Sequence, residues 1–307
     1  MSILGIDRIT YGVEDVAKCR QFFLDWGLRL VREQGESVDF ETLNGCEVQV
    51  RASGDRSLPP PIEPGSTLRE VIWGVEGEAD LQGLRARLGA DAEWSPGDAT
   101  LRTRDPNGLG LGFRVTRKRA VDVRGVPINA WGQPGRGVNR RSTFYERAEP
   151  VEVGHVVFFT DNLAAAQRFY VEKLGFCVSD SYPGRGVFLR CAVEGGHHDL
   201  FLLQPPVAKR GLNHVAFAVR DIHEVFGGGM HVSRCGWETE LGPGRHPISS
   251  AYFWYVKNPA GGLIEYYTDE DQLDATWVPQ EFQQGPEVFA EWAVVGGIDG
   301  KTRRAHR

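Results

Sequence analysis

The sequence predicts an α+β fold in which four βαβββ modules pair into two sheet-rich domains. The first observation is an internal repeat. LGIDRITYGVEDVAKCRQFFLDWGLRLV near the start and VGHVVFFTDNLAAAQRFYVEKLGFCV in the second half both read as a strand, a helix, a glycine and a further strand. The second is turn chemistry, because DPNG at 105–108 and NPAG at 258–261 separate apolar stretches as turns do between paired strands. Both observations indicate duplication of one module.

Each half opens with a strand followed by an amphipathic helix. In the second half, Asp161 or Asn162 is positioned to cap the helix and Gly175 to end it. The apolar face between them comprises Leu163, Ala166, Phe169, Tyr170 and Leu174. The first half repeats this rhythm before the stop at Gly27, with Val16, Cys19, Phe22, Phe23 and Trp26.

The repeat continues downstream, so that each half holds two modules. LREVIWGVEG matches LNHVAFAVRD, and RDPNGLGLGFRV matches KNPAGGLIEYYT. We therefore predict an N-terminal two-module domain without metal at 1–118 and a C-terminal domain at 150–270.

Two segments fall outside the modules. Residues 119–149 are rich in glycine, proline and arginine and poor in periodicity, which predicts a linker. Its candidate anchors are Ile128, Trp131, Phe144 and Tyr145. Residues 271–307 are predicted to pack as a tail on the second domain before a basic end, through Trp277, Phe282, Phe289 and Trp292. The stretches FGGGMH and GPGRHP are expected to form mobile loops around a cleft.

The composition is ordinary for a globular protein and excludes two classes of partner. Of 307 residues, 41% are hydrophobic and 25% charged, and the formal net charge is -6. The net charge gives no basic footprint, the charges are scattered along the chain, and no apolar stretch approaches ~18 residues, so we expect no nucleic acid and no membrane as partners. The start lacks a secretory leader, and the five cysteines have no CxxC spacing. We therefore expect a cytoplasmic protein with buried thiols.

Three residues far apart in the chain predict a metal site. His155 lies in VEVGHVVFFT, His214 in GLNHVAFAV and Glu265 in GGLIEYYTD, so each is expected on a β-strand. Apolar strands rarely bury such side chains without a partner. Two neutral imidazoles and one carboxylate on a face of an octahedral ion leave adjacent positions open, an arrangement that non-haem Fe(II) oxygenases use. Any one of these histidines alone would more often be structural, so the prediction depends on the three together.

The first half lacks this set. Alignment of the repeats places Arg8, Glu70 and Gly112 at the three ligand positions. An arginine that faces a glutamate would fill the vacated centre as an ion pair. We therefore expect metal only in the second half and an architectural role for the first.

The motifs resemble those of the type I extradiol ring-cleaving dioxygenases of the vicinal oxygen chelate superfamily, also called the glyoxalase/bleomycin resistance superfamily. The resemblance rests on HVVFFT, HHDLFLL, NHVAF, RHPISSAYFWY and IEYYTD, in this order within a duplicated module. It implies two vicinal-oxygen-chelate domains, with His155, His214 and Glu265 binding Fe(II) or, less often, Mn(II). It also implies a homo-oligomeric enzyme of aromatic hydrocarbon catabolism that opens the ring of a catechol-type diol next to the two hydroxyls, with incorporation of O2.

The resemblance also assigns roles beside the metal. His198 matches the acid-base histidine of the family, and His246 and Tyr255 match a hydrogen-bonding pair beside the ring and dioxygen. A histidine with a pKa near neutrality is suited to take a catechol proton and later return one. Because His197 is adjacent, a one-residue shift in strand register would exchange the two faces. Tyr255 would otherwise be one more aromatic residue of the core.

Substrate contacts are less clearly marked in the sequence. Some members of the family carry an asparagine two residues after the first histidine, where this chain has Val157, so we expect a more apolar wall. Arg190 and Arg245 are candidates for binding a substrate carboxylate, although an outward-facing arginine is an equal alternative.

Two other functions remain open at this stage. A glyoxalase-like isomerase of the same superfamily would use the metal to polarise a carbonyl, but that chemistry normally takes a fourth protein ligand, for which the first half has no obvious candidate. A metal-free small-molecule-binding protein would keep the fold and lose the ligands. The retention of His155, His214 and Glu265 argues against it.

Overall fold

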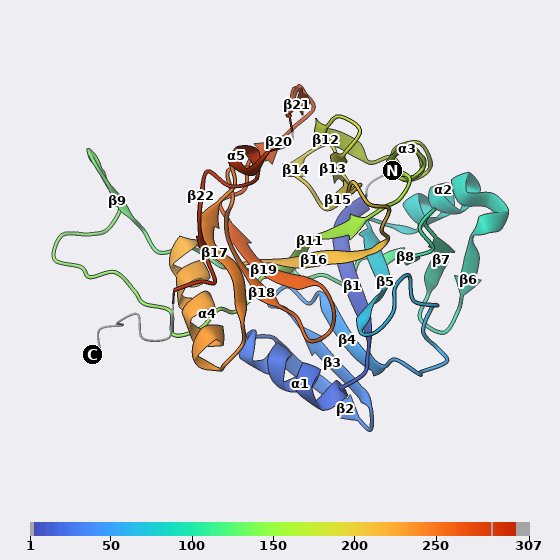
Figure 1. The fold of residues 1–307 in the computed structure, drawn as a ribbon, viewed down its shortest axis with the longest axis horizontal. Coiled ribbons are helices and arrows are strands. Elements are labelled where there is room, and N and C mark those ends of the chain that lie inside the picture. The colour runs from blue at the N-terminus through green and yellow to red at the C-terminus, as the bar shows by residue number, and fades with distance from the viewer. Residues whose placement is uncertain (1–2, 284, 299–307) are drawn as a thin grey trace.

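The computed structural model describes residues 3–283 and 285–298 and contains four βαβββ modules, as predicted (Figure 1). The first module comprises β1 (Ile3–Val13), α1 (Val16–Asp25), β2 (Arg29–Gln34), β3 (Ser37–Glu41) and β4 (Glu47–Ala52). The second comprises β5 (Thr67–Val75), α2 (Glu78–Leu88), a 3-10 turn (Gly89–Asp91), β6 (Glu93–Ser95), β7 (Thr100–Arg104) and β8 (Gly110–Val115). Together they form one eight-stranded sheet in the order β2-β3-β4-β1-β5-β8-β7-β6.

The second half repeats this architecture. Its first module comprises β11 (Glu152–Phe159), α3 (Leu163–Arg168) continued by a π-helical turn (Phe169–Leu174), β12 (Cys177–Tyr182), β13 (Gly186–Arg190) and β15 (Leu200–Leu203). The next comprises β16 (Gly211–Ala218), α4 (Ile222–Arg234), β17 (Thr239–Arg245), β18 (Tyr252–Lys257) and β19 (Leu263–Thr268). Their ten-stranded sheet has the order β21-β12-β13-β15-β11-β16-β19-β18-β17-β22.

Short elements connect and extend the two sheets. They are β9 (Asn129–Ala130), β10 (Gln133–Pro134), β14 (Gly195–Gly196), β20 (Gln272–Leu273), β21 (Gln280–Glu281), α5 (Pro286–Phe289) and β22 (Trp292–Val295). β21 and β22 add to the two edges of the second sheet, and β20 pairs with β14. The described part of the predicted tail therefore joins the second sheet by backbone pairing.

Helix ends follow local sequence chemistry. The Asn162 side chain accepts a hydrogen bond from the backbone N–H of Ala165, which satisfies one of the free donors at the start of α3. Gly175 ends the π-helical turn with φ 84°, a left-handed conformation that costs glycine little. Asp15 caps α1 in the equivalent place, by accepting from the backbone N–H of Lys18.

Strand register shows that the two halves are equivalent residue by residue. In the first sheet Thr10 pairs with Glu70, and in the second Val157 pairs with His214. Counting two residues back along β1 and β11 then makes Arg8 the counterpart of His155. The same logic along β8 and β19 makes Gly112 the counterpart of Glu265, because Ile72 pairs with Gly112 and Ala216 with Glu265. The alignment of the repeats is therefore confirmed.

The vacated centre of the first half holds ion pairs, as expected. Arg8 Nη2 lies 3.3 Å from Glu70 Oε2 and 3.1 Å from Asp98 Oδ2. Arg102 Nε donates to Glu70 Oε1 at 2.8 Å, so a second guanidinium shares the same carboxylate. These buried and half-buried charges compensate one another, which is the condition for burying them.

The halves share one hydrophobic core. The rings of Trp26, at the end of α1, and Tyr266, on β19, stack with centroids 3.6 Å apart and planes 8° from parallel. The Tyr266 hydroxyl also donates to the Trp26 carbonyl oxygen at 2.6 Å. Beside them, Trp237 Nε1 donates to Asp25 Oδ2 at 2.8 Å. These contacts join the end of α1 in the first half to β19 and to the turn between α4 and β17 in the second.

Two expectations about irregular segments are wrong. FGGGMH is not a loop but part of α4. Gly228 and Gly229 let this helix pack directly against Tyr266 and Trp254, because a Cβ at either position would overlap those rings. Most of GPGRHP belongs to β17. In the linker, Ile128 and Trp131 are exposed, and the β9–β10 hairpin projects from the body of the molecule (Figure 1).

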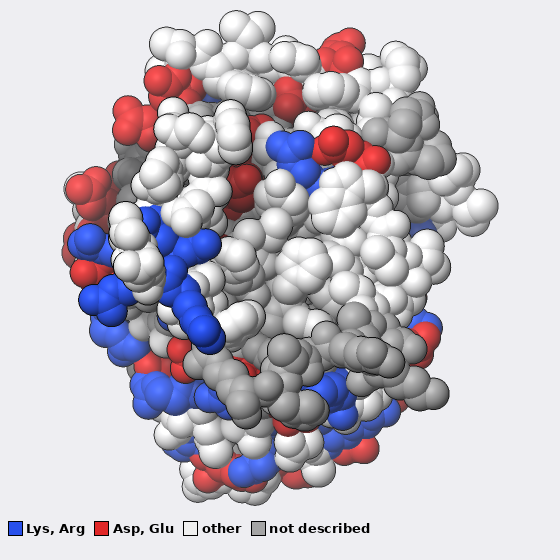
Figure 2. Space-filling view, turned by 90° about the vertical axis from the view of Figure 1, so that its left-hand side faces the viewer, with Lys and Arg blue, Asp and Glu red and all other residues white. Residues whose placement is uncertain are grey.

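The surface carries charges of both signs. On the face shown in Figure 2, uncharged residues occupy much of the area, a group of basic side chains lies left of the centre, and basic and acidic side chains lie side by side above it. None of the helices in the described part of the chain has the length and apolar composition that a membrane span requires.

Candidate metal centre

Three adjacent central strands position the predicted ligands. β11, β16 and β19 are neighbours in the second sheet, and they carry His155, His214 and Glu265 respectively. All three residues are buried, with exposed fractions of 4%, 8% and 1%. Because the strands are flanked on both sides by others, the sheet itself holds these groups in place.

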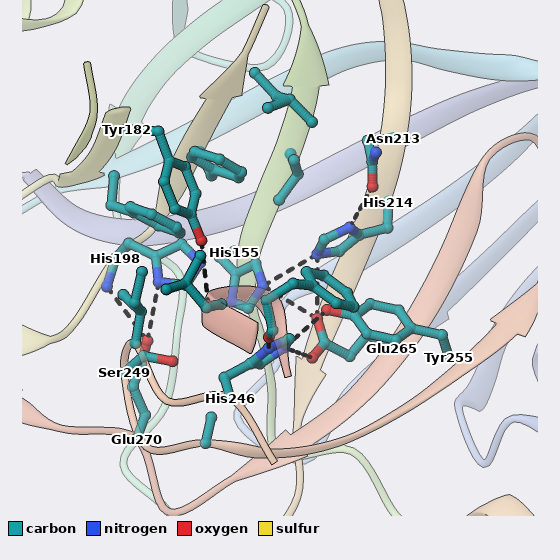
Figure 3. Close-up of a pocket in the computed structure, with 18 of the residues that line it drawn as sticks. His155, Tyr182, His198, Asn213, His214, His246, Ser249, Tyr255, Glu265 and Glu270 are labelled. Carbon is teal, nitrogen blue, oxygen red and sulfur yellow. Dashed lines mark hydrogen bonds and ion pairs between the residues drawn. The ribbon is translucent and has the colours of Figure 1, made fainter. Parts of the chain in front are cut away.

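The three side chains converge on one point (Figure 3). His155 Nε2 and His214 Nε2 are 3.3 Å apart. Glu265 Oε2 lies 3.2 Å from the first nitrogen and 3.1 Å from the second. Ligands at about 2.1 Å from an octahedral ion and at right angles to each other are roughly 3 Å apart. The triangle of donor atoms therefore fits a single divalent cation.

The hydrogen bonds around the triangle leave its donor atoms free for such an ion. His214 Nδ1 donates to Asn213 Oδ1 at 2.7 Å, which leaves the Nε2 lone pair directed at the centre. Among the described residues, buried Glu265 Oε2 has no hydrogen bond of normal geometry, although both Nε2 atoms face it. A buried carboxylate oxygen without a donor is costly, and a cation would remove that cost.

The electrostatics favour the protonation states that bind metal. Burial, reinforced by neighbouring His198, lowers the pKa of His155 to about 4. Burial alone would raise the pKa of Glu265, but its interactions with His155, His214 and His246 outweigh burial and hold that pKa well below its ordinary value. A neutral imidazole and an ionised carboxylate are the forms that coordinate a cation.

His198 lies against the same centre. Its ring centroid is 4.2 Å from that of His155, and burial followed by the proximity of His197 lowers its pKa well below the ordinary value. His198 lines the pocket, whereas fully buried His197 does not. Of the two adjacent histidines, His198 is therefore the one that faces the pocket, and its role as acid and base stays a prediction.

His246 and Tyr255 lie on the opposite side of the centre, beside Glu265 (Figure 3). His246 Nε2 and the Tyr255 hydroxyl are 3.1 Å apart, and His246 Nδ1 is 2.6 Å from the Phe289 carbonyl oxygen, to which it donates. Burial and the nearby Glu265 carboxylate raise the pKa of Tyr255 well above its ordinary value, so the phenol keeps its proton.

The remaining walls of the pocket are apolar. The cavity measures about 530 Å³, and Val157 contributes to its wall as expected. The other apolar contributors include Phe188, Phe201, Leu203, Ile248, Val288 and Phe289. Among the described residues that line it, none is a lysine or an arginine.

The two predicted substrate arginines lie elsewhere. Arg190 is buried outside the pocket lining, and its guanidinium donates to the carbonyl oxygens of Val178 and Val193 and to Ser179 Oγ. Arg245 pairs with Glu291 at 2.7 Å and also donates to the Ser250 carbonyl oxygen. Neither arginine lines the pocket, and both guanidinium groups are occupied by contacts within the fold, so their role in binding substrate stays a prediction that this geometry does not support.

Glu270 was not identified from the sequence. Its Oε1 accepts from the backbone N–H of His198 at 3.3 Å and lies 3.4 Å from His198 Nδ1. Burial raises the pKa of Glu270 to about 7, against the opposing influence of nearby His155 and His197. Its context, TDED, is that of a solvated acidic turn, so no local signal distinguished it.

Comparison with known proteins agrees with this geometry. Residues 152–266 match the profile of the Glyoxalase/Bleomycin resistance protein/Dioxygenase superfamily. The chain is 30% identical over 228 residues to metapyrocatechase 2 of Cupriavidus necator, a match covering 69% of this chain and 70% of that protein. It is 24% identical over 290 residues to the manganese-dependent 2,3-dihydroxybiphenyl 1,2-dioxygenase of Geobacillus genomosp. 3, covering 86% and 84% of the two chains.

A solved structure shows the same fold. The Mn(II)-bound glyoxalase from Novosphingobium aromaticivorans superimposes with a TM-score of 0.76 at 24% identity, over 96% of this chain and 93% of that one. With the sequence identity and coverage given above, this chain belongs to the glyoxalase/bleomycin resistance protein/dioxygenase superfamily, also known as the vicinal oxygen chelate superfamily.

Proposed function

We propose that this protein is a metal-dependent extradiol dioxygenase, which opens the aromatic ring of a catechol-type substrate next to the diol with incorporation of O2. The observation that carries the proposal is the convergence of His155, His214 and Glu265 within 3.3 Å of one another at the base of a pocket. The names of the sequence relatives support the same reaction class.

His155, His214 and Glu265 would hold the metal, and the donor set favours Fe(II). Two imidazoles and one carboxylate are the ligands of non-haem Fe(II) oxygenases, whose open positions take substrate and dioxygen. When bound, the ion supplies redox chemistry that brings a diol and O2 together on one centre. Mn(II) is the alternative, since one sequence relative is named as manganese-dependent.

The side chains around the centre handle protons and charge. His198, as a neutral imidazole, takes a proton from a substrate hydroxyl and returns it to an oxygen of the opened product. The Tyr255 O–H donates to His246 Nε2, because His246 Nδ1 already donates to the Phe289 carbonyl oxygen, and the hydroxyl can turn from there to negative charge that develops beside Glu265. Each preorganised donor of this kind is typically worth a few kcal/mol in the transition state.

The pocket wall indicates a substrate without an anionic substituent. The described lining residues include no lysine or arginine, and Glu270 adds a carboxyl group close to His198. A substrate carboxylate would be buried against Phe188, Phe201 and Leu203 without a partner, which costs several kcal/mol. Alkyl-, halogen- or aryl-substituted catechols fit this wall.

We also propose that the protein is a cytoplasmic homo-oligomer. The support for assembly is the arm of residues 128–138 around the β9–β10 hairpin, which projects from the body and in which Ile128, Trp131 and Val138 are each more than half exposed (Figure 1). Exposed apolar side chains on a projecting arm are typical of contacts between subunits. Sedimentation of the wild type and of Trp131→Ala tests this, and a monomeric wild type would contradict it.

The decisive experiment is metal analysis after anaerobic purification, followed by oxygen uptake with catechols. Bound Fe(II) or Mn(II) together with catechol-dependent oxygen uptake and a yellow ring-opened product is the expected result. Bound Zn or Ni without oxygen uptake would instead indicate a glyoxalase-like isomerase. Absence of any tightly bound metal, with catechol binding retained, would indicate a small-molecule-binding protein.

The substrate class is tested with a matched pair of catechols. 4-Methylcatechol and 3,4-dihydroxybenzoate have similar size and differ in charge. An unpaired buried carboxylate that costs several kcal/mol corresponds to a loss of at least about 100-fold in kcat/KM. Equal kcat/KM values for the two compounds would show that a cation reaches the pocket and would reject the apolar assignment.

A further inference from the structure

Behind His198 lies a row of buried polar side chains that the proposed function does not use. Asp180, on β12, has Oδ2 2.8 Å from His197 Nε2. His197 Nδ1 in turn lies 3.1 Å from His198 Nδ1. The exposed fractions of the three residues are 3%, 0% and 9%, so water has little access to these contacts. The row therefore runs from a carboxylate at the back to the pocket at the front.

Counting donors and acceptors fixes the direction of every bond in this row. Asp180 Oδ1 accepts the backbone N–H of Gln280 at 2.7 Å, and Oδ2 is an acceptor for His197. A neutral imidazole has one N–H and one lone pair, so when His197 Nε2 donates to Asp180, its Nδ1 is an acceptor. The N–H that points at this acceptor must then belong to His198 Nδ1.

Glu270 also requires a hydrogen on His198 Nδ1. Its Oε1 lies 3.4 Å from His198 Nδ1 and already accepts the backbone N–H of that residue. Two acceptors therefore face one ring nitrogen of His198. A histidine with hydrogen on Nδ1 keeps its lone pair on Nε2, at the other edge of the ring.

We propose that Asp180 and His197 are positioning residues that fix His198 as the Nδ1–H tautomer, with the Nε2 lone pair available to the pocket as a proton acceptor. The catalytic consequence rests on the proposed function, whereas the tautomer itself does not. In the reaction, an O–H bond of the diol breaks as an N–H bond forms at Nε2. The resulting imidazolium donates through Nδ1 to His197, whose other nitrogen faces the Asp180 carboxylate.

Asp180→Asn reverses the direction of the row without changing its shape. The amide oxygen is still needed by the Gln280 N–H, so the amide NH2 faces His197 Nε2 and donates to it. His197 then carries its hydrogen on Nδ1 and donates to His198, which is left with hydrogen on Nε2. The residue that should accept a proton would present one instead. In the Ser-His-Asp triad, the equivalent Asp-to-Asn change leaves the geometry intact and lowers kcat by about 10⁴ through the wrong tautomer.

The first measurement is ¹⁵N NMR of the histidine rings in Zn(II)-loaded protein, which is diamagnetic and needs no turnover. The spectrum distinguishes Nδ1–H from Nε2–H rings, and His198→Gln identifies the signal by its disappearance. Residue 198 is expected as Nδ1–H in the wild type and as Nε2–H in Asp180→Asn. An Nε2–H signal in the wild type would overturn the proposal, whether or not any variant folds.

The second measurement is turnover. Asp180→Asn should lower kcat by about 10²- to 10⁴-fold, with the metal content unchanged and KM within a few-fold, because a general base contributes that much to the rate. Asp180→Glu restores an acceptor and should recover part of the loss. Asp161→Asn, which removes a surface carboxylate paired with Arg210, is the matched control and should turn over like the wild type.

The outcomes separate this inference from the proposed function. If the wild type consumes no oxygen with any catechol, the proposed function fails, and the NMR result still decides the tautomer. If the wild type turns over catechol and Asp180→Asn matches it in both kcat and tautomer, only the positioning role of Asp180 and His197 is rejected.

Discussion

At the scale of single residues, Glu265 and His198 are expected to give opposite defects when replaced. Glu265→Ala removes the one carboxylate of the centre and leaves two imidazoles, so the protein should lose its metal and therefore its activity. His198→Phe keeps all three ligands and the ring volume and removes only the proton acceptor. It should retain metal and lose about 10²- to 10⁴-fold in kcat. Metal content per subunit and kcat, measured on the same samples, check both expectations.

Asn213→Ala should give a smaller loss of metal affinity than Glu265→Ala. It removes the acceptor of the His214 Nδ1–H and leaves every ligand in place. Outer contacts of this kind typically change metal affinity or activity by 10- to 100-fold. If Glu265→Ala retained stoichiometric metal, the assignment of the centre would be incorrect, and undiminished turnover by His198→Phe would remove that residue from its role.

The site residues that lie in the repeated apolar strands could be predicted from the sequence, whereas those outside these strands could not. His155, His214 and Glu265 each occupy an apolar strand, and the structure brings them together, although their role as ligands stays a prediction. Glu270 is different, since only its distant partner His198 distinguishes it from a surface acid. Arg190 lies outside the pocket lining because its guanidinium bonds to backbone carbonyl oxygens, and these contacts depend on loop positions that no local pattern encodes.

At the scale of elements, the glycines of α4 are expected to be sites of close packing. A Cβ added at Gly229 would lie 2.0 Å from Trp254 Cδ2, and the indole cannot move because it is fully buried. Gly229→Ala should therefore lower the free energy of unfolding by about 1–3 kcal/mol, the usual cost of overpacking. Chemical denaturation measures the change.

Gly83→Ala in α2 is the matched control for this prediction. It is also a glycine-to-alanine change inside a helix, but its added Cβ meets nothing within 4 Å. The intrinsic helix preference of alanine should then raise stability by about 0.5–1 kcal/mol. A stabilising Gly229→Ala would show that α4 does not press against Trp254 as the structure has it.

Helices were predictable from the sequence where apolar periodicity and caps agreed, as in α1 and α3. The prediction failed for α4 because three consecutive glycines have low helix propensity. Burial of the helix against Trp254 and Tyr266 offsets that intrinsic cost. Contacts of this kind join residues far apart in the chain, so a local window does not contain them.

At the scale of the whole molecule, the repeat predicted the modules and their register but not how the two halves pack. Trp26 in the first half stacks on Tyr266 in the second, and the internal repeat contains no information about which residues of the two halves contact each other. The same holds for β22, which closes one edge of the second sheet next to β17. The predicted boundaries of the domains and linker stay a prediction, whereas the fold class is confirmed.

The Trp26 contact leads to a prediction about coupling between the halves. Trp26 is fully buried, and Trp26→Ala would leave a cavity between α1 and β19, the strand that carries Glu265. The expected loss is about 3–5 kcal/mol in the free energy of unfolding. Because Tyr266 follows Glu265 directly, this variant should also release metal more readily than the wild type.

Trp94→Ala is the control, because it removes the same residue type from the first half at a place remote from the second. Trp94 lies in the edge strand β6 and is 38% exposed, so its loss should cost less and leave metal retention unchanged. Calorimetry and metal release under a chelator measure the two effects. Equal losses of unfolding free energy and equal rates of metal release in the two variants would contradict the prediction. The first half would then affect metal retention only through overall stability, and not through the stack of Trp26 on Tyr266.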